Sequence, residues 1–486
     1  MQDQILILNF DNAYSATIAS RLRAERIAAK ILPGHTTAEQ VLAKESLGVI
    51  LSGGISGDIP VSLDGQLLRS GIPILALGNI VPAVITLLGG QVEEALPVNK
   101  VDTLTFLPSC VTEDLGESER MFGTLFPLSL TDDLEPLATY HDLALGASHK
   151  TQEIYAVGCQ LEPNDPDMFN LMMQFATNVC GCTPWWSEDA FISLARTAIQ
   201  EAAGEERAIC VMSGGLDSGV TALIAHRALG DRLTCLFVDN GLLRENEMVE
   251  FAAYYKSLGL QLNIINARER VLSALAGKIN QEDKRQALRK VLSQVLEEAA
   301  ADMCYSLQVV SSSSDHLFAG RNAPATSPLL KPKTRSIAPL NDLFKDEIRR
   351  IGEALGMPQE MTNMQPFPWS GLALRILGEC TVDKLNLLRW ADHQFCNDIK
   401  EAGLSKRLWK YFAMLCDIPY QGEQPALAIA LRALSISHTG SDLRALPARL
   451  PYDLLERYTQ RAQSYDKRIR KIIYDLTPGA SLQETE

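Results

Sequence analysis

The hexapeptide Ser213-Gly-Gly-Leu-Asp-Ser218 combines residues that can hold a phosphate group. It follows the apolar run 208–212 and precedes the helical pattern 220–228, so we expect a strand, a glycine-rich turn and a helix N-terminus. The glycines let backbone N–H groups approach an anion, and the helix dipole favours negative charge there. Hydroxyl donors and a carboxylate that can hold Mg²⁺ on the phosphates complete a phosphate cradle. Its predicted residues are Ser213, Gly214, Gly215, Leu216, Asp217 and Ser218.

This hexapeptide resembles the PP-loop of the N-type ATP pyrophosphatases, which split ATP between its α and β phosphates. The resemblance continues along the chain, because Leu233 to Arg244 is close to the second strand and loop of GMP synthetases, and 343–349 and 450–453 follow in that family's order. It implies an enzyme that uses ATP and Mg²⁺ to adenylate O2 of xanthosine monophosphate and then displaces AMP with ammonia. Val238 would pack on the adenine base, although an ordinary buried strand end is the alternative.

The first part of the chain resembles a second enzyme family, but it lacks the reactive residues of that family's active site. Segments 50–54 and 71–75 are similar in order and spacing to class I glutamine amidotransferase domains. That family places a cysteine on a sharp strand-to-helix turn, where its pKa is lowered and backbone N–H groups stabilise an oxyanion. Here Gly78 replaces the cysteine, Gln160 replaces the catalytic histidine, and Glu162 persists. We therefore expect no glutaminase activity, and a domain that acts as a scaffold, a docking surface or a regulatory lid.

The acceptor half of the resemblance also departs from the family. The family has a segment with an aspartate and a glutamate, followed by a pair of histidines. In this chain Asp315 matches the aspartate, and neither the glutamate nor the two histidines have a counterpart. Basic residues in the same region could bind a phosphate, although a solvated basic loop is an equal alternative. A tryptophan and a serine stand where the family has small residues, and the tryptophan could stack on a different base. The resulting candidate acceptor pocket consists of Lys331, Lys333, Arg335, Trp369 and Ser370.

Cysteine usage points away from disulfides and metal. Ten cysteines in 486 residues are too sparse for a disulfide scaffold, and the Cys180-Gly-Cys182 pair lacks the second pair that a zinc site needs. Cys159 precedes Gln160 on an expected strand and would face the opposite side, so it is a poor substitute nucleophile.

The elements that would position these residues indicate an α/β protein. Apolar runs at 4–8, 48–51 and 73–77 alternate with helical patterns, which predicts a parallel sheet covered on both faces. The length suggests about three domains. The resemblance assigns them as a class I glutamine amidotransferase-like domain over 1–184, an N-type ATP pyrophosphatase domain over 185–378, and a small α+β C-terminal dimerisation domain over 379–486.

Composition restricts the partners. A formal net charge of −14 repels polyanions, so we expect neither nucleic acid nor an anionic membrane as a partner. The apolar runs fall short of the roughly 20 residues of a membrane span, and no signal sequence is recognisable, which predicts a soluble cytoplasmic protein.

Three functional hypotheses follow. The first is a GMP synthetase-like ligase that adenylates a carbonyl oxygen of xanthosine monophosphate or a related purine nucleotide, with pyrophosphate release. Ammonia or another nucleophile would then come from a separate donor protein. The second is a non-catalytic, ATP-binding paralogue that regulates a partner enzyme, and the third is a PP-loop sulfur transferase acting on a nucleotide base. The intact PP-loop favours an enzyme. The family also implies a homodimer, with Arg470 and Lys471 on a helix-like stretch at its interface.

Overall fold

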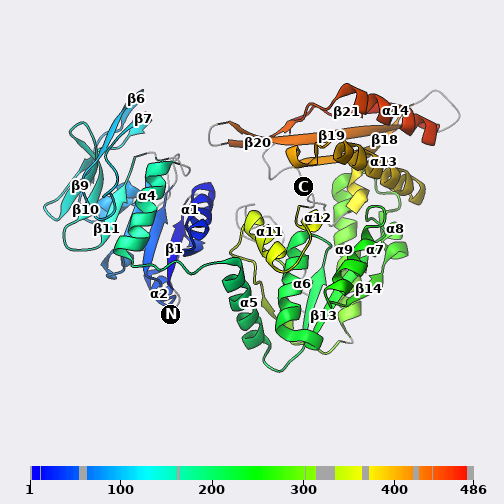
Figure 1. Ribbon diagram of the computed structural model, residues 1–486, viewed down its shortest axis with the longest axis horizontal. Helices are drawn as coiled ribbons and strands as arrows, with labels where there is room; N and C mark the ends of the chain where they lie inside the picture. Colours follow the sequence, from blue (N-terminus) through cyan, green and yellow to red (C-terminus); the bar gives the residue numbers. More distant parts are fainter. Residues whose placement is uncertain are drawn as a thin grey trace. The chain divides into compact units, whose positions relative to one another are not determined.

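The computed structural model describes residues 3–10, 12–53, 63–159, 161, 165–301, 303–312, 334–363, 371–419, 426–439 and 442–478. The chain divides into two compact units, residues 1–191 and 192–486. Unit 1 contains one mixed sheet, and unit 2 contains a parallel sheet and a second mixed sheet (Figure 1). The three-domain division expected from the sequence stays a prediction.

Unit 1 is built on an 11-stranded sheet whose main path runs β2-β1-β3-β4-β11-β10-β9-β6-β7, with β5 paired to β8 beside it. Its strands are β1 (Gln4–Asn9), β2 (Ala28–Pro33), β3 (Gly48–Ser52), β4 (Ile74–Leu77), β5 (Gln91–Val92), β6 (Leu96–Phe106), β7 (Glu117–Leu125), β8 (Leu128–Ser129), β9 (Leu134–Tyr140), β10 (Leu143–His149) and β11 (Ile154–Val157). Its described α-helices before the boundary are α1 (Asn12–Ala24), α2 (Ala38–Leu42), α3 (Val81–Leu87) and α4 (Pro166–Gln174).

Only half of this sheet matches the expectation of a parallel sheet. Strands β2, β1, β3, β4 and β11 pair in parallel, and the central run 5–8 of β1 is fully buried, as a strand covered on both faces must be. The remaining main-path strands are antiparallel, so the sequence prediction is wrong for them. The physical reason is the short connections: a two-residue turn at His141 and Asp142 joins β9 to β10, and such a turn can only reverse the chain.

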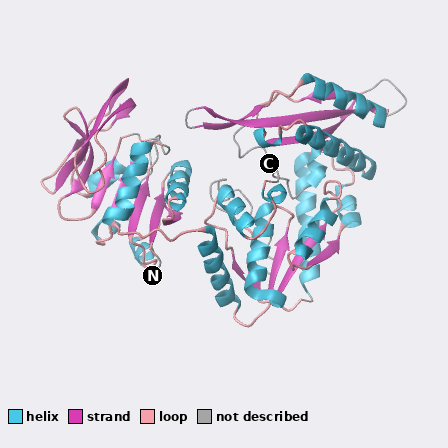
Figure 2. Cartoon of the chain, viewed as in Figure 1, coloured by secondary structure: helices cyan, strands magenta, loops and turns pink. Residues whose placement is uncertain are grey.

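Unit 2 begins with a five-stranded parallel sheet in the order β14-β13-β12-β15-β16, with helices on both sides (Figure 2). Apolar residues of α9 pack on the strands, because Leu296 and Ala300 join Ile209 and Leu236 in one buried cluster. The strands are β12 (Ala208–Met212), β13 (Leu233–Asp239), β14 (Leu262–Asn266), β15 (Leu307–Val309) and β16 (Arg335–Ile337). The helices are α5 (Glu188–Ala203), which crosses the boundary between the units, α6 (Leu216–Leu229), α7 (Glu247–Ser257), α8 (Arg268–Leu275), α9 (Gln281–Ala301), α11 (Lys345–Ala354) and α12 (Gln359–Thr362).

The end of unit 2 forms a second sheet in the order β17-β18-β19-β20, with β21 paired in parallel to β19. Alternate residues of β19, among them Ile429 and Leu431, share a buried core with α13 and α14, including Phe395 and Tyr458. The elements are β17 (Ile376–Leu377), α13 (Val382–Glu401), β18 (Lys410–Ile418), β19 (Ala426–Thr439), β20 (Asp442–Pro447), α14 (Tyr452–Tyr465) and β21 (Ile469–Tyr474). Arg470 and Lys471 therefore lie on a strand, and the prediction of a helix-like stretch there is wrong.

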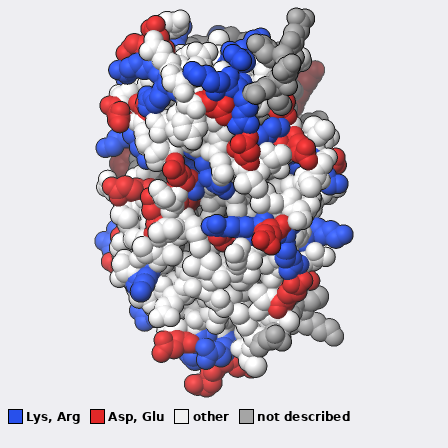
Figure 3. All heavy atoms as spheres, turned by 90° about the vertical axis from the view of Figure 1, so that its right-hand side faces the viewer, with Lys and Arg blue, Asp and Glu red and all other residues white. Residues whose placement is uncertain are grey.

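Charged side chains of both signs are mixed on one face of the molecule. On the face drawn in Figure 3, Lys and Arg alternate with Asp and Glu, and neither sign gathers into an extended patch among the described residues. The described residues of this face therefore form no positively charged patch that would attract a polyanion.

Candidate functional site

The predicted phosphate cradle lies between the carboxyl end of β12 and the start of α6. Gly215 is the N-cap of α6, with φ −78° and ψ 164°, and no side chain caps the helix there. The N–H groups of the first turn therefore receive no side-chain cap, and such an end favours an anion. The expectation of strand, turn and helix at this sequence agrees with the structure.

The two serines of the loop hold its turn in shape. The N–H of Ser213 donates to Oγ of Ser218 at 3.2 Å, and the two hydroxyl oxygens are 3.1 Å apart. Ser218 also donates to the carbonyl oxygen of Gly215 at 2.9 Å. Because Ser218 is 2% exposed, its hydroxyl is set by the loop itself.

Gly214 must be a glycine for two reasons. Its φ is +87°, in the left-handed region where a side chain is strained. A Cβ at this position would also lie 3.0 Å from a ring carbon of Phe251, a contact tighter than ordinary packing. The backbone of the loop is therefore packed closely against Phe251 at this position.

Asp217 pairs with a lysine that the sequence analysis did not identify as a site residue. Nζ of Lys345 lies 2.5 Å from Oδ1 of Asp217, with the two side chains 35% and 19% exposed. Lys345 is the first residue of α11, 128 positions further along the chain. The only signal for Lys345 in the sequence is that it lies in segment 343–349, which resembles the GMP synthetases. The cradle thus combines amides, hydroxyls, a carboxylate and an ammonium group.

The strand next to β12 ends in an ordered turn. Phe237 of β13 is in register with Met212, so the end of β13 lies beside the PP-loop. Asp239 accepts from Nε of Arg268 at 2.8 Å and from the N–H of Gly241 at 3.1 Å. Val238 is half-buried and packs against two core clusters, so its side chain contributes to the core whether or not it also contacts a base.

Arg335, the one acceptor candidate among the described residues, is not brought together with the PP-loop. Arg335 begins β16 in register with Leu307, at the amino end of the sheet, and its guanidinium pairs with Glu206. The PP-loop follows the opposite, carboxyl end of β12. The other acceptor candidates, together with the ATP-side candidate Asp315, lie outside the described residues: Lys331, Lys333, Trp369 and Ser370.

Gly78, the residue expected in place of the family's nucleophile, lies on a sharp turn of unit 1. Leu77 ends β4 in an extended conformation, Gly78 has φ +71°, and α3 follows three residues later. The N–H of Gly53 donates to the carbonyl oxygen of Leu77 at 2.9 Å, which ties the neighbouring loop to this turn. The turn therefore carries a hydrogen atom where a reactive side chain would stand. Gln160 and Glu162 lie outside the described residues.

Cys159 is chemically shielded. It is 2% exposed, and burial raises the pKa of its thiol to about 12. A thiol with that pKa is almost entirely protonated at neutral pH and is a poor nucleophile. This environment agrees with the expectation that Cys159 does not replace the missing nucleophile.

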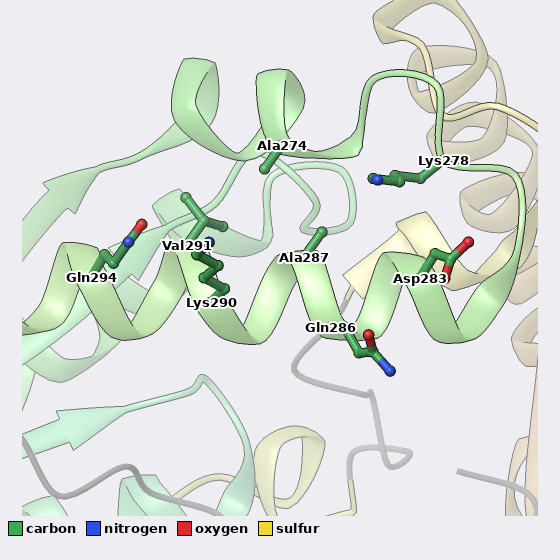
Figure 4. Close-up of a pocket in the computed structure, with 8 residues that line it drawn as sticks. All are labelled: Ala274, Lys278, Asp283, Gln286, Ala287, Lys290, Val291 and Gln294. Carbon is green, nitrogen blue, oxygen red and sulfur yellow. The ribbon is translucent and has the colours of Figure 1, made fainter.

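An open cavity in unit 2 lies away from the cradle. It is about 460 Å³ in volume and lies between α8 and α9 (Figure 4). None of the PP-loop residues lines it, so we place the candidate site by the geometry of the loop rather than by this cavity. The lining residues are Ala274, Lys278, Asp283, Gln286, Ala287, Lys290, Val291 and Gln294.

The described residues offer few protein ligands for a metal ion. Within the described ranges, no three His, Cys, Asp or Glu side chains gather closely enough to hold a metal ion. A divalent ion at Asp217 would therefore depend on phosphate oxygens for most of its ligands, as Mg²⁺ commonly does.

None of the helices in the described part of the chain has the length and apolar character needed to cross a bilayer.

Comparison with known proteins decides the family. The glutamine-hydrolyzing GMP synthase of Caldicellulosiruptor saccharolyticus is 33% identical over 515 residues, covering 99% of this chain and 100% of the relative. The enzymes of the same name from Carboxydothermus hydrogenoformans and Clostridium perfringens are 31% and 32% identical with the same coverage. This chain belongs to the GMP synthase family. The resemblance carried by the PP-loop and by 233–244 is thereby confirmed.

Other comparisons add little. No family model matches the chain. The crystal structure of a GMP synthase subunit from Thermoplasma acidophilum covers 37% of this chain and 95% of its own, with 19% identity and a TM-score of 0.33. A superposition of that quality is too poor to support a conclusion about fold or function.

Proposed function

We propose that this GMP synthase family member is an ATP-dependent ligase that adenylates a carbonyl oxygen of a purine nucleotide and releases pyrophosphate. The observation that carries the proposal is the cradle itself, in which the ion pair of Asp217 and Lys345 joins the hydroxyl-bonded turn of Ser213 and Ser218. Xanthosine monophosphate is the acceptor that the family suggests, and a related purine nucleotide is the alternative.

Each group of the cradle has a proposed task. The N–H groups at the start of α6 and the hydroxyl of Ser213 bind phosphate oxygens, while the buried hydroxyl of Ser218 holds the turn in shape. Asp217 would hold Mg²⁺, which would supply charge neutralisation for the bond between the α and β phosphates. Lys345 balances the charge of Asp217 in the absence of nucleotide, and we expect its ammonium group to turn toward the departing pyrophosphate.

The nucleophile is proposed to be free ammonia or an amine from a separate donor protein. Gly78 has no side chain that could attack glutamine, and the buried Cys159 does not replace it. We therefore propose that unit 1 performs no glutamine hydrolysis, unlike the relatives whose names specify it.

The first experiment measures pyrophosphate release from Mg·ATP with xanthosine monophosphate and either ammonium or glutamine as the nitrogen source. We expect turnover with ammonium and none with glutamine. Asp217→Asn removes the proposed metal ligand and should lower turnover by at least about 100-fold. Asp231→Asn, at an exposed position beyond the far end of α6, is the matched control and should leave turnover unchanged.

The possible results separate the candidate functions. Binding of ATP without turnover on any purine nucleotide would favour the non-catalytic paralogue. Glutamine-dependent turnover would contradict the proposed inactivity of unit 1 and leave the ligase intact. Failure to bind ATP at all would contradict both the ligase and the paralogue.

A further inference from the structure

The loop that follows β13, residues 240–244, is held in place from a distant helix. Arg389 of α13 donates to two of its carbonyl oxygens, with Nε 2.9 Å from the oxygen of Leu243. The N–H of Leu372 donates to a third carbonyl oxygen of the loop at 2.8 Å. We call residues 240–244 the β13 loop. Every one of these anchors is more than 100 positions away in the sequence.

Asp392, also on α13, lies between two arginines from different segments. Its Oδ2 is 3.0 Å from Nε of Arg244 at the end of the β13 loop, and its Oδ1 is 3.1 Å from Nη1 of Arg375. The same Oδ1 accepts from the N–H of Ala413 in β18 at 3.0 Å. One carboxylate therefore joins the β13 loop, the short 3-10 helix Gly371–Arg375 and the second sheet of unit 2.

Because the cluster is buried, its two arginines depend on the carboxylate of Asp392 to balance their charge. The side chain of Asp392 is 2% exposed, and those of Arg375 and Arg244 are 9% and 21% exposed. Burial lowers the pKa of Arg375 to about 10, while Asp392 raises it and the like charge of Arg244 lowers it. Removing the carboxylate would leave two like charges facing each other in a largely dry environment, where their repulsion is strong.

We propose that Asp392 is a positioning residue for ATP, which fixes the β13 loop beside the PP-loop by holding Arg244. The inference rests on the proposed ligase function, and it assigns to Asp392 no contact with substrate. The loop continues the strand that carries Val238, and the register of Phe237 with Met212 sets that strand next to the cradle. A displaced β13 loop should therefore weaken nucleotide binding more than it slows the chemical step.

The test compares Arg244→Gln, Asp392→Asn and the double variant in the full-length chain. The assay is pyrophosphate release with Mg·ATP, xanthosine monophosphate and ammonium. Each single variant should raise the KM for ATP about tenfold or more, with kcat at saturating ATP within about threefold of wild type. Because both changes disrupt the same ion pair, the double variant should be no worse than Asp392→Asn alone. Arg244→Gln leaves Asp392 paired with Arg375, so it is informative even if Asp392→Asn fails to fold.

Asp398→Asn is the matched control, because Asp398 lies on the same helix and pairs with Arg461 of α14 at 2.8 Å and 3.1 Å. It should change neither kinetic constant. A folded Arg244→Gln protein with the wild-type KM for ATP overturns the inference and leaves the proposed function standing. A wild-type chain that binds no Mg·ATP by calorimetry overturns both. Equal effects of Asp392→Asn and Asp398→Asn on the KM would show a merely structural role and also overturn the inference.

Discussion

At the residue scale, we propose that single side chains decide which of the two candidate sites in this chain can react. In unit 2 the loop 213–218 carries the side chains of the proposed phosphate cradle, and Lys345 of α11 pairs with one of them. In unit 1 the turn at Gly78 keeps the backbone of a reactive site without a reactive side chain.

The left-handed conformation of Gly78 predicts a measurable cost for any side chain. Its φ of +71° costs about 1–2 kcal/mol for a residue with a Cβ, so Gly78→Ala should lower the unfolding midpoint of unit 1 by roughly 2–8 °C. Gly116→Ala is the control, because a Cβ there meets nothing within 4 Å and the backbone is not left-handed. Scanning calorimetry gives both midpoints. Equal midpoints for the two variants would contradict the strained turn.

How much of the site the sequence predicted depends on the distance between its residues. The cradle of 213–218 is contiguous, so residue type and spacing were enough to predict strand, turn and helix. Lys345 and Asp392 were missed because each meets its partner across more than 100 positions, and no local pattern encodes such a contact. The buried pair of Arg244 and Asp392 depends on how α13 packs, which only the folded chain reveals.

At the scale of elements, the helices α9 and α13 fix the segments that carry the chemistry. The same scale explains the failed part of the fold prediction. Alternating apolar runs indicated the parallel strands of unit 1 correctly, whereas the strands from β6 to β10 have mixed exposure and short turns that give no such pattern. Likewise, the expected helix at 470–471 is a strand, because pairing with β19 decides the conformation there.

The tie between α9 and β17 predicts a pH-dependent stability. Lys284 of α9 is fully buried and donates to the carbonyl oxygens of Ile376 at 2.6 Å and Ala373 at 3.3 Å. Lys284→Met leaves both oxygens without this donor and should lower the free energy of unfolding by about 1–3 kcal/mol. Burial lowers the pKa of Lys284, so the unfolded chain binds the proton more tightly. The stabilising contribution of Lys284 therefore rises with pH, from its lowered pKa up to about 10.4.

Urea titrations between about pH 7 and pH 10 check this sign, since the titration of a lysine spans that window when its pKa is lowered. The gap in stability between wild type and Lys284→Met should widen as the pH rises. Lys290→Met, at an exposed position of the same helix, should show no such trend. A gap that narrows with pH would mean that the buried amine gains a proton on folding, contrary to the expected direction.

At the scale of the whole molecule, we expect a homodimer formed through the outer face of the second sheet in unit 2. In β21, Ile472 and Tyr474 pack against the core shared with α13 and α14, so Lys471 and Ile473 point to the opposite face. Ile473 is 43% exposed in the single chain, which is unusual for an isoleucine in the middle of a paired strand. The family expectation placed Arg470 and Lys471 together at a dimer interface, and we expect the face that carries Lys471 and Ile473 to supply its apolar contact.

Light scattering coupled to size exclusion tests the dimer directly. Wild type should elute with twice the 53.4 kDa of one chain. Ile473→Glu should shift it to the monomer mass, because a dimer would then have to bury an unpaired carboxylate from each protomer. Val249→Glu changes an apolar residue of α7 that is 70% exposed, and should leave the dimer intact. A wild-type monomer would contradict the expected dimer. A dimer that tolerates Ile473→Glu but not Val249→Glu would place the interface away from β21.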